Sequence, residues 1–300
     1  MPRPLRLAAA LALLAVAAAT VAGVRAADAA YPGGNGLIVF VSNRGGGGYA
    51  LYTMKPDGSG VHRITPKAAM VRQPAWSPDG SQIAYVQNSR IWVVTASGAG
   101  AHAIGPTGGV GFPTWGPGGA KLVFEWNDSV FSMAADGTAV TPVRVDEGAG
   151  SFSKWAPSWS ADGTRIVYVE GNGEHSGSIW AMSPTGAGAH ALTTGGDLGN
   201  IDSAPDWSPN GKRVALERYI DCSGGSCTNA VWVMNANGSG LHQVLKDAAF
   251  PSWSPDGTKL SFVRKVGGSS EIFVASANGT AVKRLTKSYA SDFSPDWQPS

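Results

Sequence analysis

The sequence predicts an all-β fold, a six-bladed β-propeller built from four-stranded antiparallel blades. The prediction rests first on a motif of the form Pro-x-Trp-Ser-Pro-Asp-Gly, complete in Pro74–Gly80, whose tryptophan recurs at intervals of 39 to 48 residues. It rests also on the short apolar runs after each copy and on 41 glycines and 19 prolines, which favour many tight turns. A period of about 40–50 residues is typical of repeat architectures such as propellers. The repeat tryptophans are Trp76, Trp115, Trp159, Trp207, Trp253 and Trp297.

Each repeat contains four segments with strand character. The first carries the tryptophan and ends in the Pro-Asp-Gly turn. The second is a nearly continuous apolar run, such as Gln82–Val86, which is typical of a strand covered on both faces. The third, such as Ile91–Val94, leads through a glycine turn into a more polar fourth segment, such as Ala101–Ile104. This change from buried to half-exposed indicates a blade that runs outward from a central channel.

The two ends of the repeat array predict how the ring closes. The first unit, Leu37–Thr65, has no tryptophan segment before it, and the last tryptophan segment, Pro295–Gln298, has no strands after it. We therefore expect the C-terminal strand to join the N-terminal three strands and complete the sixth blade, because closure removes exposed sheet edges. An open solenoid of the same repeats is the alternative, and it would leave both end strands unpaired.

Residues 1–29 are predicted to be a signal peptide, and residues 30–300 the propeller domain. Arg3 and Arg6 precede the apolar run Leu7–Ala22, and small residues suited to cleavage follow it. The run is shorter than the roughly 20 residues that a membrane span needs, although an uncleaved anchor is the alternative. The mature chain is therefore expected to be extracytoplasmic, either periplasmic or secreted, without a membrane span.

Charge and cysteine usage narrow the classes of partner. Loss of residues 1–29 would remove three basic residues and one acidic residue from totals of 23 and 21, which leaves equal numbers. Without a basic excess, no nucleic-acid partner is expected. Cys222 and Cys227 enclose only Ser-Gly-Gly-Ser, so in an exported protein we expect a disulfide across this loop. A metal at these cysteines would need two further ligands, and no metal or other cofactor is expected.

The repeats resemble the WD-like repeats of TolB-type propellers. The resemblance rests on copies such as Pro251–Gly257, followed by an apolar strand and a segment such as Val231–Met234, and it covers all six repeats. It implies a non-catalytic, protein-binding propeller in the periplasm. TolB carries an α/β domain ahead of its propeller, whereas the first blade strand begins here at Leu37, so we expect the propeller alone. Related propellers occur in serine peptidases and pectin-degrading lyases, so the repeat by itself does not determine function.

The order of strands assigns the loops to two faces. The Pro-Asp-Gly turns and glycine turns are short and uniform, and they lie together on the uniform face. The loops between second and third strands and the connections between blades lie on the opposite, variable face, where binding is commonly found. These longer loops are Asn43–Gly48, Asp146–Trp155, Glu170–Gly177, Gly195–Ser203, Tyr219–Asn229, Lys265–Ser270 and Lys287–Asp292.

Residues just before each proline are expected to line the channel mouth on the variable face. From this register we predict a partner-binding site that consists of Arg72, Lys154, Trp155, Asp202, Phe250, Asp292 and Phe293. Aromatic and arginine side chains anchor many protein interfaces, so a protein or peptide partner is expected. The alternative is that these residues only fill the channel.

Catalytic candidates are sparse. Four histidines occupy equivalent places on outer strands, where they point away from one another and cannot share a metal: His62, His102, His190 and His242. His175 is the only histidine on the variable face. No nucleophile elbow, His-Glu-x-x-His motif or Walker lysine is present, so no enzyme is expected. Calcium held at the mouth by Asp202 and Asp292 stays open as an alternative.

Together these features favour an exported, monomeric, non-enzymatic propeller that serves as a protein- or peptide-binding scaffold. The alternative is a lyase-like enzyme or binding protein that acts on extracellular polysaccharide. For that alternative, the candidate residues are Arg72, Lys154, His175, Asp202 and Asp292.

Overall fold

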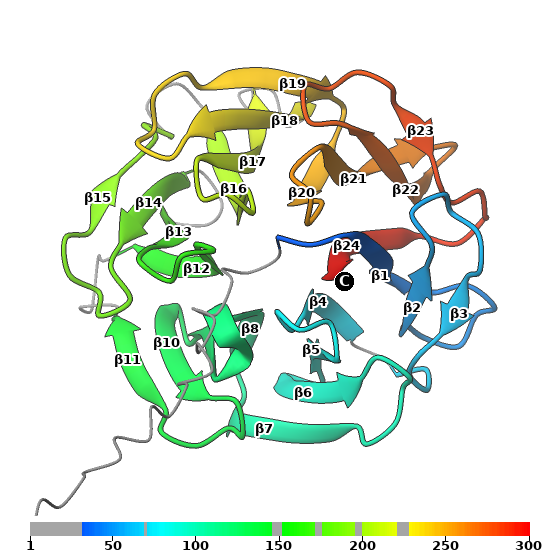
Figure 1. Cartoon of the computed structure of the whole chain (residues 1–300), viewed down its shortest axis with the longest axis horizontal. Coiled ribbons are helices and arrows are strands. Elements are labelled where there is room, and N and C mark those ends of the chain that lie inside the picture. The colour runs from blue at the N-terminus through cyan, green and yellow to red at the C-terminus, as the bar shows by residue number, and fades with distance from the viewer. Residues whose placement is uncertain (1–31, 69–70, 146–151, 172–175, 196–199, 221–227) are drawn as a thin grey trace, which may run out of the picture.

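Six four-stranded antiparallel sheets surround a central channel in the computed structural model of this chain (Figure 1). The structure describes residues 32–68, 71–145, 152–171, 176–195, 200–220 and 228–300. The predicted all-β, six-bladed propeller is therefore confirmed. The helical element of the described residues is one 3-10 turn, η1 (Pro117–Gly119).

Each blade runs outward from an innermost strand that carries the repeat tryptophan. Blade I combines β24 (Asp292–Pro299) with β1 (Asn35–Ser42), β2 (Ala50–Met54) and β3 (His62–Arg63). Blade II contains β4 (Val71–Trp76), β5 (Gln82–Gln87), β6 (Arg90–Thr95) and β7 (His102–Thr107). Blade III contains β8 (Val110–Trp115), β9 (Lys121–Trp126), β10 (Ser129–Ala134) and β11 (Thr141–Arg144).

The other three blades repeat this order. Blade IV contains β12 (Ser153–Trp159), β13 (Ile166–Gly171), β14 (Ser178–Met182) and β15 (His190–Ala191). Blade V contains β16 (Ile201–Trp207), β17 (Arg213–Ile220), β18 (Thr228–Asn235) and β19 (His242–Lys246). Blade VI contains β20 (Ala249–Trp253), β21 (Lys259–Val266), β22 (Ser269–Ser276) and β23 (Lys283–Arg284).

Hydrophobic cores lie between neighbouring blades. Trp76 of blade II packs in one cluster with Val39 and Leu51 of blade I and with Ile83 of its own blade. The second strands are buried on both faces, as their continuous apolar runs predicted. The outermost strands are short and largely exposed. Blade-on-blade packing, rather than one central core, therefore holds the ring together.

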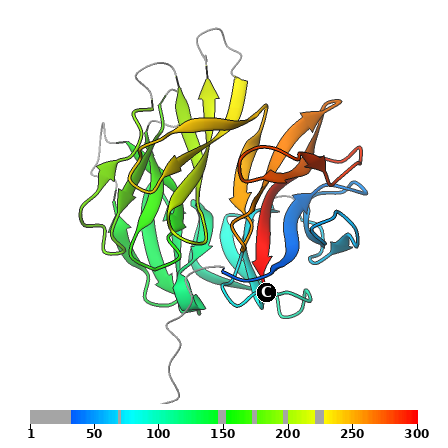
Figure 2. The same cartoon turned by 45° about the horizontal axis from the view of Figure 1, so that its top comes forward.

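The C-terminal strand closes the ring, as predicted. β24 pairs with β1 in the register Ile38↔Trp297 and Val41↔Phe293. Ser300 and Gly34 exchange two backbone hydrogen bonds, with N···O distances of 2.8 and 3.2 Å. Figure 2 shows β24 beside β1 in the same blade. The last and first strands of the described chain therefore form one sheet.

The loops differ between the two faces, with one correction. On the uniform face, the Pro-Asp-Gly turns share one geometry, in which Ser77 donates to the Asp79 carboxylate at 2.6 Å. On the variable face, Lys265–Ser270 was predicted to be a long loop and is instead a tight hairpin. Its ladder continues to the pair Val266↔Ser269, because Gly267 and Gly268 both adopt positive φ and turn the chain in two residues.

Candidate functional site: the channel and its mouth

The central channel contains a cavity of about 160 Å³ lined by all six innermost strands. Two rings of equivalent residues form much of its wall. The mouth ring consists of the residue before each proline: Gln73, Phe112, Ala156, Ala204, Phe250 and Ser294. The inner ring consists of the residue after each proline: Ala75, Thr114, Ser158, Asp206, Ser252 and Asp296.

All six mouth-ring residues adopt left-handed backbone conformations. Their φ angles lie between 45° and 54°, and none of them is glycine. Each sits at a bulge where the ladder with the second strand shifts register, as between Ser203 and Asp206 in blade V. A non-glycine residue in this region costs on the order of 1–3 kcal/mol, and such strain is concentrated at functional sites. The mouth ring therefore carries backbone strain at one equivalent position in every blade.

Phe112 and Phe250 occupy opposite positions in the mouth ring, and Phe112 also packs against the cluster between blades IV and V. Their blades, III and VI, lie on opposite sides of the channel (Figure 1). The backbone N–H of Phe112 donates to Gln73 Oε1 at 3.0 Å, and that of Phe250 donates to Glu217 Oε2 at 3.3 Å. In both cases a side chain of the preceding blade holds the phenylalanine backbone in place.

The inner ring contains two carboxyl groups deep in the molecule that face the channel. Trp253 N–H donates to Asp206 Oδ2 at 2.8 Å, and Ser252 Oγ donates to Asp296 Oδ1 at 3.2 Å. Burial raises the pKa of Asp206 to about 7, and the nearby charge of Asp296 adds to this shift. Burial likewise raises the pKa of Asp296 to about 6. Among the cavity-lining residues, these two are the only ionisable ones.

Of the seven residues predicted to bind a partner, Phe250 lines the cavity. Asp202 and Asp292 are instead fully buried at the start of their innermost strands, and each is ion-paired. Arg218 donates to both Asp202 oxygens at 2.6 and 2.8 Å, and Arg44 Nη2 donates to Asp292 Oδ2 at 2.8 Å. A calcium ion or a catalytic base at Asp202 would have to replace a guanidinium group, whereas Oδ1 of Asp292 is buried without a hydrogen-bond partner among the described residues.

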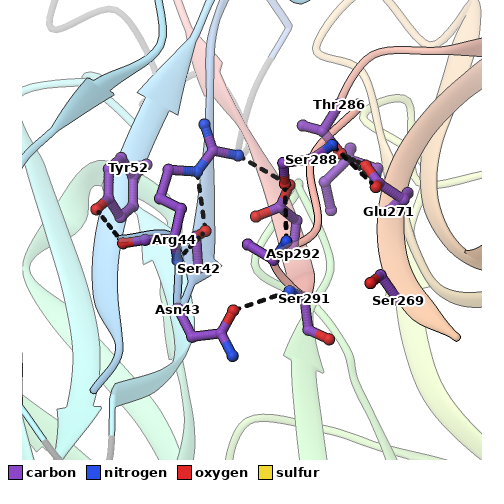
Figure 3. Close-up of polar contacts among 12 residues, drawn as sticks. Ser42, Asn43, Arg44, Tyr52, Ser269, Glu271, Thr286, Ser288, Ser291 and Asp292 are labelled. Carbon is purple, nitrogen blue, oxygen red and sulfur yellow. Dashed lines mark hydrogen bonds and ion pairs between the residues drawn. The ribbon is translucent and has the colours of Figure 1, made fainter. Parts of the chain in front are cut away.

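Figure 3 shows the polar network around Asp292. Besides Arg44, the carboxylate meets Ser288 Oγ at 3.5 Å. Ser288 N–H in turn donates to Glu271 Oε1 at 3.1 Å, and Glu271 also accepts Thr286 Oγ1. Glu271 lies on blade VI and Arg44 follows β1 of blade I, so this network ties the sixth blade to the first.

The other four predicted residues join neighbouring parts of the scaffold. Arg72 donates to the Val110 carbonyl of the next blade at 3.2 Å, and Phe293 meets Tyr49 edge to face at 5.5 Å between ring centroids. Lys154 is buried, and its Nζ donates to the Phe152 carbonyl. Trp155 is partly buried against a cluster between blades IV and V.

Several site residues escaped prediction from sequence. Glu125 and Glu217 occupy one repeat position, where the other blades carry valine, and burial raises the pKa of each, that of Glu125 to about 7. A glutamate that ends the apolar run Leu122–Phe124 was the available signal. Asp206 and Asp296 lie inside the tryptophan motif, for which the sequence predicts a strand that ends in a tight turn.

The remaining sequence candidates carry no site in the described residues. The four outer-strand histidines are exposed, and in His102, His190 and His242 the Nδ1 atom lies 2.8 Å from a glycine carbonyl. In the described ranges, no three His, Cys, Asp or Glu side chains converge as metal ligands would. His175, Cys222, Cys227 and residues 1–29 lie outside the described residues. The described part of the chain has no helix with the length and hydrophobicity of a membrane span.

Comparison with known proteins supports the fold and only part of the predicted function. No family model matches the chain. The Tol-Pal system protein TolB of Anaeromyxobacter dehalogenans is 26% identical over 100 residues, 33% of this chain and 22% of that protein. The crystal structure of TolB from Acinetobacter baumannii has a TM-score of 0.74 at 20% identity, covering 88% of this chain and 67% of that one. The resemblance to TolB-type propellers is thus confirmed at the level of fold.

Enzymes also share this architecture. The crystal structure of oligogalacturonate lyase from Vibrio parahaemolyticus has a TM-score of 0.57 at 12% identity, covering 87% of this chain and 78% of that one. Likeness at such identity shows the fold alone. The sequence match spans less than a quarter of the curated TolB relative's length, so it does not transfer that protein's activity or partners to this chain.

Proposed function

We propose that this chain is an exported, non-enzymatic propeller that binds a protein or peptide partner through its variable face. The observation that carries the proposal is that the exposed aromatic side chains of the described residues all lie on that face. Within the described residues, the exposed aromatic residues are Phe152, Phe250 and Tyr289, with exposed fractions of 51%, 38% and 106%. Aromatic residues are enriched at protein interfaces, and a soluble scaffold has no structural need to expose them.

The topology places these three residues at one end of the ring. Phe152 directly precedes β12, Phe250 is the second residue of β20, and Tyr289 lies in the connection from β23 to β24. All innermost strands begin at the variable face, so the three side chains share it. Of the three exposed valines in the described residues, Val61 and Val282 follow glycine turns and lie on the uniform face, whereas Val145 follows β11 and lies on the variable face.

The scaffold reading fits the rest of the molecule. Six of the predicted residues would support this face from inside the scaffold through the contacts described above. They are Arg72, Lys154, Trp155, Asp202, Asp292 and Phe293. Asp202 and Asp292 are buried and each is ion-paired with an arginine, so neither is an exposed base, which supports a non-enzymatic role. The fold likeness to TolB and the predicted signal peptide support an extracytoplasmic location, and we propose that the protein is a monomer.

A pull-down from envelope extract and culture fluid tests the proposal. The bait is the full mature chain, compared with a Phe152→Ala/Tyr289→Ala double variant and with Val61→Ala/Val282→Ala as the matched control on the opposite face. We expect a specific partner that the aromatic variant recovers at least about tenfold less well, since interface aromatics commonly contribute more than about 1 kcal/mol. Equal recovery by all three baits would refute binding through this face.

A further inference from the structure

We propose that Asn210 is a site of spontaneous deamidation, at which the folded chain converts this asparagine to aspartate. Asn210 stands in the Pro-Asn-Gly turn between β16 and β17, on the uniform face and away from the proposed partner-binding face. The amide nitrogen of Gly211 attacks Cγ of Asn210, and ammonia leaves as the five-membered succinimide ring closes. Water then opens the ring at Cγ to give aspartate, or at the main-chain carbonyl to give isoaspartate.

The sequence alone does not single out Asn210. An Asn-Gly pair favours this reaction, because asparagine is thermolabile and a following glycine leaves the attacking nitrogen unhindered. The described residues contain four such pairs, which begin at Asn35, Asn210, Asn237 and Asn278. In the three pairs that lie in turns, Oδ1 of the asparagine accepts the N–H two residues further on, at 3.0 to 3.2 Å. Because these bonds are alike, packing must distinguish the turns.

Asn35 is held at both ends of its side chain. Its Nδ2 donates to Asp256 Oδ2 at 2.8 Å, and its Oδ1 accepts the Asp256 N–H at 3.2 Å. A Cβ atom added to Gly36 would lie 2.8 Å from the Gln298 carbonyl oxygen, so the main chain is also covered. This pair therefore lacks the freedom to form a ring.

The two glycine turns of blades V and VI are covered by the preceding blade. A Cβ atom added to Gly238 would lie 2.6 Å from the Leu192 carbonyl oxygen, and one added to Gly279 would collide with that of Val244. Ring closure requires the Asn-Gly peptide to rotate, and a glycine pressed against backbone cannot move with it. Gly211 differs, because among the described residues no heavy atom lies within 4 Å of such a Cβ atom.

A single substitution in the preceding blade leaves Gly211 uncovered. In the equivalent turns of the other blades, the glycine packs near the proline of the preceding turn, and a Cβ atom on Gly257 would lie 3.3 Å from Cγ of Pro209. Blade IV carries Ala161 where the other turns carry proline, so Gly211 of blade V lacks this contact. The turn at Asn210 therefore opens locally at a lower cost than its equivalents.

Aspartate at position 210 fits the turn as it stands. In blade IV, Asp162 accepts the hydroxyl of the serine two residues before it at 2.7 Å and the N–H two residues after it at 3.0 Å. Asn210 Oδ1 accepts the corresponding groups of Ser208 and Lys212 at 2.9 and 3.0 Å. Arg165 donates to the carbonyl oxygen of the next residue at 3.2 Å, so a cation already lies beside the new charge.

The isoaspartate product does not fit in the same way, because it lengthens the main chain inside the turn. The turn is closed by the Gly211 N–H, which donates to the Ser208 carbonyl at 2.8 Å, and by the Ser208 N–H, which donates to the Arg213 carbonyl at 2.9 Å. An extra methylene between these groups breaks the pattern. We therefore expect aspartate to be the main product in the folded chain.

The repeat itself provides the variants for a test. Ala161→Pro restores the residue that the equivalent turns carry, and the backbone bonds that close its turn come from the residues on either side of it. Asp79→Asn is the matched control, because it places an Asn-Gly pair in a turn whose glycine, Gly80, is covered by the Pro299 carbonyl. Asn210→Asp supplies the standard for the product.

The test is the ageing of the full mature chain at neutral pH, followed by digestion and mass spectrometry that separates Asn, Asp and isoAsp peptides. We expect Asn210 to convert at least about fivefold faster than Asn237 or Asn278 in the same molecule. Ala161→Pro should slow the conversion of Asn210 at least about fivefold and leave the other two unchanged. The new asparagine of Asp79→Asn should convert as slowly as Asn278. In urea all of these asparagines should convert at similar rates, because the cover is lost.

Three results would overturn the proposal. One is a folded chain in which Asn210 stays intact or converts no faster than Asn237 and Asn278. Another is an Ala161→Pro protein that is folded by near-ultraviolet circular dichroism and still converts Asn210 at the wild-type rate. The third is conversion of the Asp79→Asn protein at its new asparagine as fast as at Asn210. Should Ala161→Pro fail to fold, the first and third comparisons decide alone.

Discussion

Asp296 Oδ2 accepts the backbone N–H of Trp76 at 2.7 Å, although the two residues are 220 positions apart in the chain. The same carboxyl group accepts the Ser252 hydroxyl at 3.2 Å. Asp296 lies on blade I, Trp76 on blade II and Ser252 on blade VI, so one side chain joins three consecutive blades at the channel wall. Asp206 makes the equivalent bond to Trp253 in the next blade. Closure of the ring therefore depends on these carboxyl groups as well as on the β24–β1 ladder.

A chain that ends at Ser291 will fail to form a stable propeller, because it loses β24, the burial of Trp297 and the Asp296 links. We expect cooperative loss of structure in all blades, and a Trp297→Ala change alone should cost about 3–5 kcal/mol. Urea unfolding followed by circular dichroism and tryptophan fluorescence measures both. Removal of Ser300 alone is the control and should cost about 1–3 kcal/mol, because it breaks two backbone hydrogen bonds with Gly34. Unchanged melting of the truncated chain would contradict closure by β24.

Asp206→Asn should make the protein progressively more stable than the wild type as pH rises. Burial raises the pKa of Asp206 from 3.8 to about 7, so the folded state holds this proton more tightly than the unfolded chain. The stabilisation that this provides is complete below about pH 4 and is lost by about pH 7. The stability difference should therefore grow by roughly 2–4 kcal/mol between pH 4 and 8. Urea unfolding across this range measures it.

Asp256→Asn is the matched control for that experiment, with the opposite sign. Hydrogen bonds from Ser254 and Thr258 outweigh partial burial and hold the pKa of Asp256 below its usual range. Its contribution to stability is therefore present above about pH 4 and is lost as pH falls, so the variant should lose stability relative to the wild type as pH rises. Parallel pH profiles for the Asp206 and Asp256 variants would disprove the assignment.

Arg218→Ala should destabilise the protein by about 3–5 kcal/mol, because it leaves the buried carboxylate of Asp202 without a cation. Asp202→Val/Arg218→Met should recover much of that loss, since the equivalent residues of blades II and III are Val71 and Val110. Chemical denaturation of the single and double variants gives both values. A single variant within about 1 kcal/mol of the wild type would show that solvent compensates Asp202.

Gly116→Ser should be destabilising even though it restores the repeat consensus. Gly116 takes the place of the serine in the tryptophan motif, and a Cβ atom there would lie 2.9 Å from Cζ3 of Trp159. Overpacking of this kind costs about 1–3 kcal/mol, which lowers the melting temperature by several degrees. The reverse change at the equivalent position, Ser160→Gly, tests whether the consensus serine stabilises its own blade, because it removes the Ser160–Asp162 hydrogen bond of 2.7 Å. A higher melting temperature for Gly116→Ser would refute the clash.

The fold was predictable because its signals are local and repeated. The spacing of the tryptophans, the apolar second strands and the unpaired ends each have a direct physical meaning, and together they determine six blades and their closure. The hairpin at Gly267 escaped because a pair of glycines can make either a flexible loop or a two-residue turn. Only the pairing of β21 with β22 distinguishes the two.

The site was harder to predict because a bulge changes the side-chain register. In a regular strand, Asp202 and Asp206 would share a face, since side chains alternate. The bulge at Ala204 and Pro205 adds one residue, so Asp202 instead shares a face with Trp207 and packs toward blade IV. Asp206 is thereby directed to the channel. A sequence pattern does not reveal such a bulge when alanine, glutamine, serine and phenylalanine all occupy it.

The mouth ring thus tolerates different residue types in one bulged backbone conformation. Six positions share one backbone shape yet carry four different residue types, so the side chain is uncoupled from the conformation that supports it. The residue at each position can therefore be replaced without a change in the backbone conformation of the blade. Because Ala156 and Phe112 also belong to the packing between blades IV and V, a substitution at the mouth ring alters the channel wall and the contact between blades together.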